Sequence, residues 1–431
     1  MEHANHTLTV IDPCRTAHAN GEHVHQRRRV SRRTLSALLL SSLLWMGPRL
    51  TQADSGPLDC SKKSLSDAIN KADDAAPTIV FTGVCAGPVV IRKDGLTLQG
   101  VGTAVIEGGS QAAVTITGVH GVALANLEVR KGLNGIVGAN GAHLSLTDVN
   151  VHDNTVFGIS LQTASSAVLT NVTTTKNGVH GLDVQTGSAA TVTKSFTTVN
   201  NRVFGINVNG SAMTFAQATV TATGNALGIQ IATNANAFLN DPTTIINVNN
   251  NLATGLTVVS GAHLVSFGGT INASGNGLNG VSVNAKGGLD LDAGSQLNSF
   301  NNGEGVLLQE GSTMTVFNIP QFSGVSGTST INTHNNTGNG MTVRNGAVLT
   351  FSNAAKIDSE QNGAVGLAVD NGSNVTLVSS TSVTSILTGN TGKDLSLTFG
   401  TRADIQTVTL GTYACDTTVL VRGASGITCP H

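Results

Sequence analysis

The chain has 431 residues and a formal net charge of −2 at pH 7; 51 residues are glycine, 11% are charged and 3% are aromatic. So few charges, with no excess of lysine and arginine, exclude a nucleic-acid binder built on basic patches. The apolar residues are spread evenly as valine, isoleucine, leucine and alanine, which favours one elongated repetitive body over several ordinary domains.

Residues 1–53 predict a leader that is removed on export. The apolar stretch 35–46 has twelve residues, too few to span about 30 Å of hydrocarbon, so no transmembrane helix is expected. Arginines precede this stretch, and small residues follow it, which predicts cleavage after Ala53. The pair Arg32 and Arg33 leaves both the general secretory and the twin-arginine route open. The mature protein is therefore expected in the periplasm, at the cell surface or in the medium.

Five histidines without periodicity lie within residues 1–26. This segment is either a metal-binding tract or an upstream extension from a misassigned start codon. In both cases it precedes the predicted cleavage site and is absent from the mature protein.

Four cysteines remain after the leader is removed, and they form two groups at the two ends of the mature chain: Cys60 with Cys85, and Cys415 with Cys429. Four cysteines allow three connectivities, of which the one made of two local disulfides is the simplest. Each local disulfide would contribute about 3 kcal/mol in an oxidising compartment. Free thiols or a metal site are the alternative, but no Cys-x-x-Cys spacing is present.

A recurring pattern sets the architecture: an asparagine, three residues, a glycine and then alternating aliphatic residues, as at 154–161 and 201–208. The glycines of this repeat are Gly135, Gly158, Gly181, Gly205, Gly228, Gly255, Gly280, Gly305, Gly340 and Gly366. Most spacings are 23 to 27 residues and one is 35, which is typical of a solenoid. Alternation with period two and turn residues between the runs indicate short strands and not helices. The pattern therefore predicts a parallel β-helix of about twelve coils, stacked about 4.8 Å apart.

Asparagines recur in register with these glycines. The position four residues before the glycine is occupied in turn by Asn154, Asn177, Asn201, Asn251, Asn276, Asn301, Asn336 and Asn362. Gly224 holds this position in one repeat, with Asn225 beside it. Asparagine tolerates the left-handed turn conformation, and amides stacked one coil apart can hydrogen-bond as a ladder. We expect the glycine to open the next strand, where a side chain would crowd the turn.

With this repeat, the chain resembles the right-handed parallel β-helix, or pectin-lyase-like, superfamily over residues 77–400. The resemblance implies the fold. It implies little about function, since the superfamily includes pectate and pectin lyases, polygalacturonases and non-catalytic surface proteins. The polygalacturonase motifs Asn-Thr-Asp, Asp-Asp, Gly-His-Gly and Arg-Ile-Lys are missing, and the arginine base of pectate lyases has no counterpart near the acidic pair described below. No catalytic residue is therefore transferred from either family.

Both ends of a solenoid need caps. Ser64 and Asp67 resemble a capping box ahead of a stripe formed by Leu65, Ile69 and Ala72, which predicts a short amphipathic helix over the first coil. The chain is thus expected to divide into an N-terminal cap at 54–86, the β-helix at 87–400 and a C-terminal cap at 401–431.

The outer face of the strands that follow the repeat glycines is rich in polar side chains. If the residue after each glycine faces inward, the residues two and four positions after the glycine face outward. An extended polysaccharide could hydrogen-bond to such a face, and the expected carbohydrate-binding residues are Phe157, Gln162, Gln185, Phe204, Asn207 and Asn209. A merely solvated sheet face is the alternative.

His180 and Asp183 are the first candidate catalytic pair. Phe157 and Phe204 hold the position of His180 in the two adjacent coils, so the imidazole would stack between two rings. A histidine and a carboxylate this close can serve as acid and base. The alternative is that His180 is a packed turn residue.

Asp290 and Asp292 form the second candidate pair. Leu289 and Leu291 are expected to face inward, which turns both carboxylates outward, about 6.6 Å apart. Such a pair could bind Ca²⁺ or act as the acid and base of an inverting hydrolase; a solvated pair is the alternative. Glu304 and Lys286 are the charged neighbours expected from the register. No other metal site and no organic cofactor are expected.

The sequence thus predicts an exported, monomeric β-helix protein for display or binding at the cell surface or in the periplasm, with carbohydrate as the expected ligand. The alternative function is a polysaccharide lyase or glycoside hydrolase of the pectin-lyase-like type with an atypical site.

Overall fold

The computed structural model describes residues 56–73, 75, 77–318, 327–378, 383–423 and 426–430. The predicted leader, its histidines and the cleavage site lie outside these residues. No helix within the described ranges is long and apolar enough to cross a membrane.

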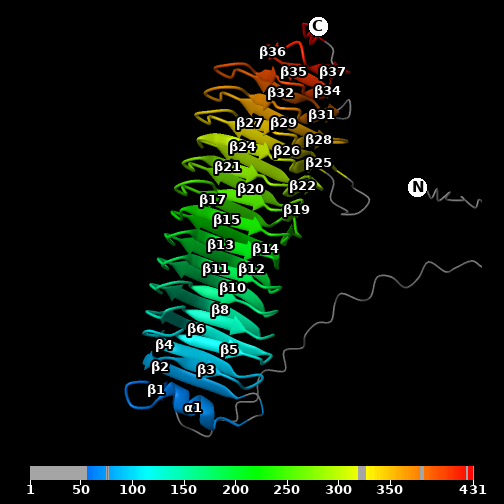
Figure 1. Cartoon of the computed structure of the whole chain (residues 1–431). Helices are drawn as coiled ribbons and strands as arrows, with labels where there is room; N and C mark the ends of the chain where they lie inside the picture. The colour runs from blue at the N-terminus through cyan, green and yellow to red at the C-terminus, as the bar shows by residue number, and fades with distance from the viewer. Residues whose placement is uncertain are drawn as a thin grey trace, which may run out of the picture. The chain divides into compact units, whose positions relative to one another are not determined.

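The described chain is a right-handed parallel β-solenoid, shown in Figure 1 with its coils following one another from blue to red. One strand of each coil belongs to a 14-stranded parallel sheet, which we call face B. Its strands are β3 (Val89–Ile91), β5 (Val114–Thr117), β7 (Ile136–Ala139), β9 (Ile159–Leu161), β11 (His180–Gln185), β13 (Phe204–Asn209), β15 (Leu227–Ala232), β18 (Leu256–Val259), β21 (Asn279–Val283), β24 (Glu304–Gln309), β27 (Met341–Arg344), β30 (Leu367–Val369), β33 (Leu395–Leu397) and β36 (Tyr413–Cys415). The sequence predicted about twelve coils because the terminal ones lack the Asn–Gly repeat.

The other strands form a second sheet with two faces. In the first coils a long strand bends at a left-handed residue, for example at Asn171 or Lys194. These long strands are β2 (Thr78–Ala86), β4 (Thr97–Glu107), β6 (Val122–Arg130), β8 (His143–His152), β10 (Ser166–Thr175), β12 (Ala189–Val199) and β14 (Ala212–Thr223). The two-residue strand β1 (Leu58–Asp59) pairs with β2. We call the part before the bend face A1 and the part after it face A2.

From the eighth coil onward, separate strands carry the two faces. Face A1 continues as β16 (Asn236–Leu239), β19 (His263–Phe267), β22 (Gly288–Asp292), β25 (Thr313–Val316), β28 (Val348–Phe351), β31 (Asn374–Val378), β34 (Arg402–Gln406) and β37 (Leu420–Arg422). Face A2 continues as β17 (Ile245–Asn249), β20 (Thr270–Ser274), β23 (Gln296–Phe300), β26 (Ser329–His334), β29 (Ala355–Glu360), β32 (Ser385–Thr388) and β35 (Val408–Leu410).

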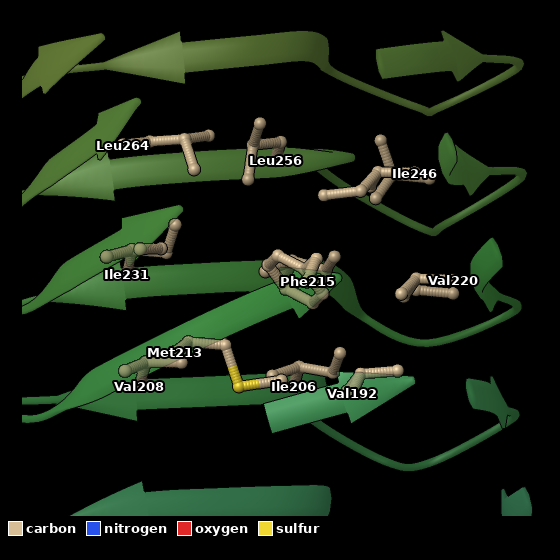
Figure 2. Close-up of a cluster of buried hydrophobic side chains, with 14 of the residues drawn as sticks. Val192, Ile206, Val208, Met213, Phe215, Val220, Ile231, Ile246, Leu256 and Leu264 are labelled. Carbon is tan, nitrogen blue, oxygen red and sulfur yellow. The ribbon is translucent and has the colours of Figure 1, made fainter. Parts of the chain in front are cut away.

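The core fills the space enclosed by the three faces. On face B the residues after the glycine point inward, so Ile206 and Val208 are fully buried and contact residues such as Val192, Met213 and Phe215 from face A1 (Figure 2). Each fully buried valine, leucine or isoleucine contributes about 1.5–3 kcal/mol. The alternate apolar residues of the sequence pattern are therefore the residues that form the core.

A buried asparagine ladder joins the coils where face A2 ends. Each asparagine after Asn154 accepts, on its side-chain oxygen, both the backbone N–H and the side-chain N–H of the asparagine one coil before. The members are Asn154, Asn177, Asn201, Asn225, Asn251, Asn276, Asn302, Asn336, Asn362 and Asn390. The ladder thus contains seven of the eight predicted asparagines; Asn302 replaces Asn301, and Asn225 and Asn390 are additional members.

The left-handed conformation belongs to the residue before each ladder asparagine, as at Asn200 and Asn250. The repeat glycine has a different role, which Gly158 illustrates. A Cβ atom there would lie 2.6 Å from the Gly181 carbonyl oxygen and 2.7 Å from Nδ2 of Asn177. The ladder and the next coil therefore exclude any side chain at that position.

Helix α1 (Leu65–Lys71) lies at the N-terminal end, as expected. The Ser64 hydroxyl accepts a hydrogen bond from the Asp67 backbone N–H, and Leu65 and Ile69 are buried against the core. Two disulfides connect Cys60 to Cys85 and Cys415 to Cys429, which are the local pairings.

Candidate functional site

The residues singled out on the strands after the repeat glycines gather on the outer side of β9, β11, β13 and β15. We call this surface the face B trough. Its floor consists of Ser160, Asp183, Asn207 and Gln230, its apolar side of Phe157, His180 and Phe204, and its amide side of Gln162, Gln185 and Asn209.

The floor is a hydrogen-bonded row. Asp183 lies between the inward residues Leu182 and Val184, so its carboxyl points outward, yet only 2% of the residue is exposed. Asn207 donates a 2.8 Å hydrogen bond to Asp183, and Gln230 donates one of 3.2 Å to Asn207. Burial raises the pKa of Asp183, and the hydrogen bond from Asn207 opposes that shift.

The apolar side is a stack of three rings. The His180 ring lies 5.2 Å from that of Phe157, with 20° between the planes, and 4.7 Å from that of Phe204. Burial lowers the pKa of His180 to about 4, opposed by a hydrogen bond with the Val179 backbone. His180 Nδ1 accepts the Phe204 backbone N–H at 3.3 Å, so a neutral imidazole with the proton on Nε2 fits the site.

The amide side is the accessible border of the trough. Asn209 is exposed, and Gln162 and Gln185 are half-buried. These amides stand one coil apart at the ends of the strands. They offer donors and acceptors at a regular spacing of about 4.8 Å.

Asp290 and Asp292 lie elsewhere, on face A1, and their environments differ. Leu289 and Leu291 are fully buried, as predicted, and the Asp290 carboxylate is 3.1 Å from Nε2 of His263. This hydrogen bond raises the pKa of His263. Asp292 is only 3% exposed, and its Oδ1 accepts the adjacent Ala293 N–H at 2.6 Å.

The expected charged neighbour Glu304 is not near Asp290, which corrects the register prediction. Glu304 begins β24 on face B, opposite Asn279 of β21. The Thr342 hydroxyl donates to its carboxylate, and burial raises the pKa of Glu304. The sequence contains a pattern that would have placed Glu304 on face B: it directly precedes the repeat glycine Gly305, just as His180 directly precedes Gly181.

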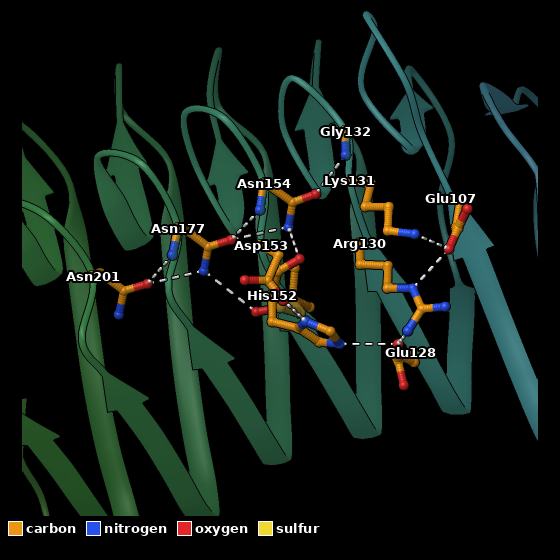
Figure 3. Close-up of polar contacts among 11 residues, drawn as sticks. Glu107, Glu128, Arg130, Lys131, Gly132, His152, Asp153, Asn154, Asn177 and Asn201 are labelled. Carbon is orange, nitrogen blue, oxygen red and sulfur yellow. Dashed lines mark hydrogen bonds and ion pairs between the residues drawn. The ribbon is translucent and has the colours of Figure 1, made fainter.

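A charged cluster on face A2 of the early coils pairs mostly with itself (Figure 3). Arg130 contacts Glu107 at 2.9 Å and Glu128 at 2.7 Å, and His152 lies 3.0 Å from Glu128. Lys131 and Arg130 lower the pKa of Glu107 by hydrogen bonding. Such partly exposed pairs contribute little to stability. Within the described ranges, no group of three His, Cys, Asp or Glu side chains is arranged to hold a metal ion.

Several solved structures resemble this chain, at low identity. The A-module of the mannuronan C-5 epimerase AlgE6 of Azotobacter vinelandii is 14% identical, with 85% of this chain and 100% of the module covered and a TM-score of 0.39. An alginate lyase from Paenibacillus is 12% identical, with coverages of 73% and 96% and a TM-score of 0.31. The surface adhesin PfbA of Streptococcus pneumoniae is 9% identical, with coverages of 79% and 92% and a TM-score of 0.22.

No curated protein sequence matches the chain significantly. Residues 93–243 match the family model described as "Right handed beta helix region". This segment runs from β4 to β16, and the same coil geometry continues to β37. The matched segment and the described coils thus share the right-handed parallel β-helix fold that the repeat predicted.

Proposed function

We propose that this protein binds an extended carbohydrate chain along the face B trough. The observation that carries the proposal is the arrangement of a polar floor between a column of rings and a column of amides. A sugar presents hydroxyl groups at its edge and C–H groups on its faces. Rings suit the C–H faces, and amides with both donors and acceptors suit the hydroxyls.

The trough is also preorganised. Because Asn207 is held by Asp183 on one side and by Gln230 on the other, its amide has little freedom left to lose on binding. The stacked rings of Phe157, His180 and Phe204 are restricted in the same way. A ligand that follows the coil axis meets a ring and an amide on each of the three coils that contain β9, β11 and β13.

The proposal includes export and monomeric display at the cell surface or in the periplasm. Its support is the signal-like leader and the two disulfides, which persist in oxidising compartments.

A second candidate function is catalysis on the bound chain, which the environment of Asp183 favours. A carboxyl group whose pKa is raised by burial stays protonated at higher pH and is suited to act as a general acid. His180, with a pKa of about 4, is a weak base near neutral pH. Asp183 is therefore the residue on which a lyase or hydrolase activity would depend.

Residues 54–431, incubated with a panel of uronic-acid and neutral polysaccharides with and without Ca²⁺, test both functions. Retention on the polysaccharide reports binding, while unsaturated products and new reducing ends report cleavage. We expect retention of the wild type on at least one polysaccharide. If cleavage occurs, Asp183→Asn abolishes it with the melting temperature unchanged, and the matched variant Asp290→Asn retains it. Absence of retention and of products across the panel would contradict the proposal.

A further inference from the structure

A second groove, outside the face B trough, lies on face A2 over β23, β26 and β29. Its volume is about 430 Å³, and its walls are formed by Asn298, Phe300, Asn332, His334, Asp358, Glu360 and Gln361. The lining residues stand in two columns, because Asn298, Asn332 and Asp358 are register partners, as are Phe300, His334 and Glu360. A groove of this size with convergent polar groups suits a small ligand or one or two sugar units.

The first column is an outer amide ladder that ends at a carboxylate. Asn272 donates to Asn247, Asn298 donates to Asn272, and Asn332 donates to Asn298, over 2.9, 2.9 and 2.6 Å. Every amide nitrogen therefore points toward the N-terminal end, and the last amide presents its oxygen to Asp358. Asn332 receives no hydrogen bond from Asp358, which has no donor, and Oδ1 of Asp358 is buried without a hydrogen-bond partner. This end of the ladder lacks a donor.

The second column provides a flat apolar surface beside that point. The rings of Phe300 and His334 are 5.1 Å apart, with only 7° between their planes. Nδ1 of His334 lies 3.1 Å from Nδ2 of Asn335, which can only donate. The imidazole of His334 is therefore assigned as the neutral tautomer with the proton on Nε2. This Nε2–H group is a hydrogen-bond donor at the groove.

Carboxylates close the C-terminal end of the groove. Oδ2 of Asp358 already contacts an ammonium group of the protein itself, Nζ of Lys356, at 2.5 Å. Glu360 is exposed, and one of its oxygens accepts the Thr388 hydroxyl at 2.9 Å. Two carboxylates and one lysine leave the groove with an excess of negative charge and an excess of acceptors.

From these contacts we propose that the face A2 groove binds a sugar that carries a protonated amine. The sugar ring lies against Phe300 and His334, and its ammonium group donates to Glu360 and to the side-chain oxygen of Asn332, which is half-buried. This site is independent of the face B trough: it stands on another face and its ligand is cationic.

The test is calorimetric titration of residues 54–431 with short glucosamine oligomers, at mildly acidic pH where the amine is charged. Matched N-acetylglucosamine oligomers have the same ring without the charge. We expect the wild type to bind the amine oligomer at least about tenfold more tightly than the acetylated one, as for a charge-assisted hydrogen bond. Glu360→Gln should remove about the same factor.

Two further variants separate this site from the rest of the molecule. Phe300→Ala should weaken binding through the lost ring contact, whereas Phe204→Ala in the face B trough should leave amine binding unchanged. Because Glu360 is exposed, Glu360→Gln and the charge reversal Glu360→Lys keep the fold, which melting curves verify. Undetectable binding, equal binding of both oligomers, or a linear polyamine bound as tightly as the sugar would each overturn the proposal.

Discussion

The ladder asparagines show how single residues hold the coils together. Asn251 accepts two hydrogen bonds from Asn225, and its own amide donates to the Ala222 carbonyl and to Asn276. The last ladder asparagine, Asn390, needs an acceptor for its N–H groups, and a carboxylate, which only accepts, provides it. Asp394 accepts the backbone and side-chain N–H groups of Asn390 at 3.0 and 2.9 Å.

Replacement of one ladder residue should therefore be costly. Asn251→Ala leaves the buried donors of Asn225 and the Ala222 carbonyl without their partners. We expect a loss of about 3 kcal/mol or more in unfolding free energy, measured by urea denaturation. The exposed Asn236 gives the control Asn236→Ala, for which a change below about 0.5 kcal/mol is expected. Equal effects at both positions would refute the role of the ladder.

His180 makes stability depend on pH. Its folded-state pKa is about 4 against an ordinary value of 6.5, so between these values the unfolded chain binds more protons than the folded protein. Stability is full above pH 6.5 and is lost as the pH falls toward 4, by at most about 3 kcal/mol. Asp183, with a raised pKa, changes stability in the opposite sense.

His180→Phe removes this titration and keeps a ring between Phe157 and Phe204. We expect its unfolding free energy to fall less than that of the wild type between pH 6.5 and 4. At higher pH it should be lower than the wild-type value by about 1 kcal/mol, because the Phe204 N–H loses its acceptor. Denaturant titrations at several pH values measure the difference. Parallel pH profiles for the two proteins would show that His180 stays charged or exposed.

At the scale of single residues, the sequence predicts the existence of the ladder but not each member. The structure places a ladder asparagine directly after the left-handed residue that ends face A2. Counting back from the glycine fails at Asn225 and Asn302, because the loop to Gly228 or Gly305 is one residue shorter there. Two adjacent asparagines, Asn301 and Asn302, cannot be told apart by residue type.

At the scale of strands, alternation predicts which side chains point outward but not which of them are accessible. Asp183 and Asn207 point outward and are nevertheless buried, and their side chains hydrogen-bond to each other. The face A2 groove escaped prediction for another reason. Its columns join residues such as Asn298 and Asn332, whose separation of 34 residues departs from the common repeat, and face A2 carries no glycine to mark the register.

The capping elements should contribute separately from the coils. The disulfide between Cys60 and Cys85 closes a segment of 25 residues over the first coil. Replacing both cysteines by serine should lower the unfolding free energy by about 3 kcal/mol. The matched change at Cys415 and Cys429, which encloses 14 residues, should cost slightly less. Melting in the presence and absence of a reductant measures both; variants as stable as the oxidised wild type would contradict this account.

At the scale of the whole molecule, each coil contacts mainly its two neighbours, so stability is close to a sum over coils and interfaces. The repeat pattern predicts this architecture because the alternation, the glycines and the asparagines agree with one another in every coil. The functional residues are not repeated in every coil in this way. The face B trough and the face A2 groove each depend on a few side chains whose neighbours come from other coils.

Removal of one complete coil should therefore preserve the fold. Deleting residues 228–254 joins Leu227 to Gly255, which are successive positions of the same register, since Ile229 pairs with Leu256. We expect a cooperative unfolding transition and a slightly lower denaturant m-value, in proportion to the shorter chain. A deletion of about half that length, residues 228–241, shifts the register and should abolish folding. The same outcome for both deletions would contradict the additive description.

The most direct test of carbohydrate binding at face B compares variants of different faces on the polysaccharide that the wild type binds most tightly. Affinity electrophoresis of the wild type, Phe204→Ala and Thr221→Ala gives the three dissociation constants, with Thr221 as the control on face A2. The face B trough predicts at least about tenfold weaker binding for Phe204→Ala, because a ring contact is lost, and unchanged binding for Thr221→Ala. Equal affinities of all three proteins would place the ligand elsewhere and contradict the proposed function.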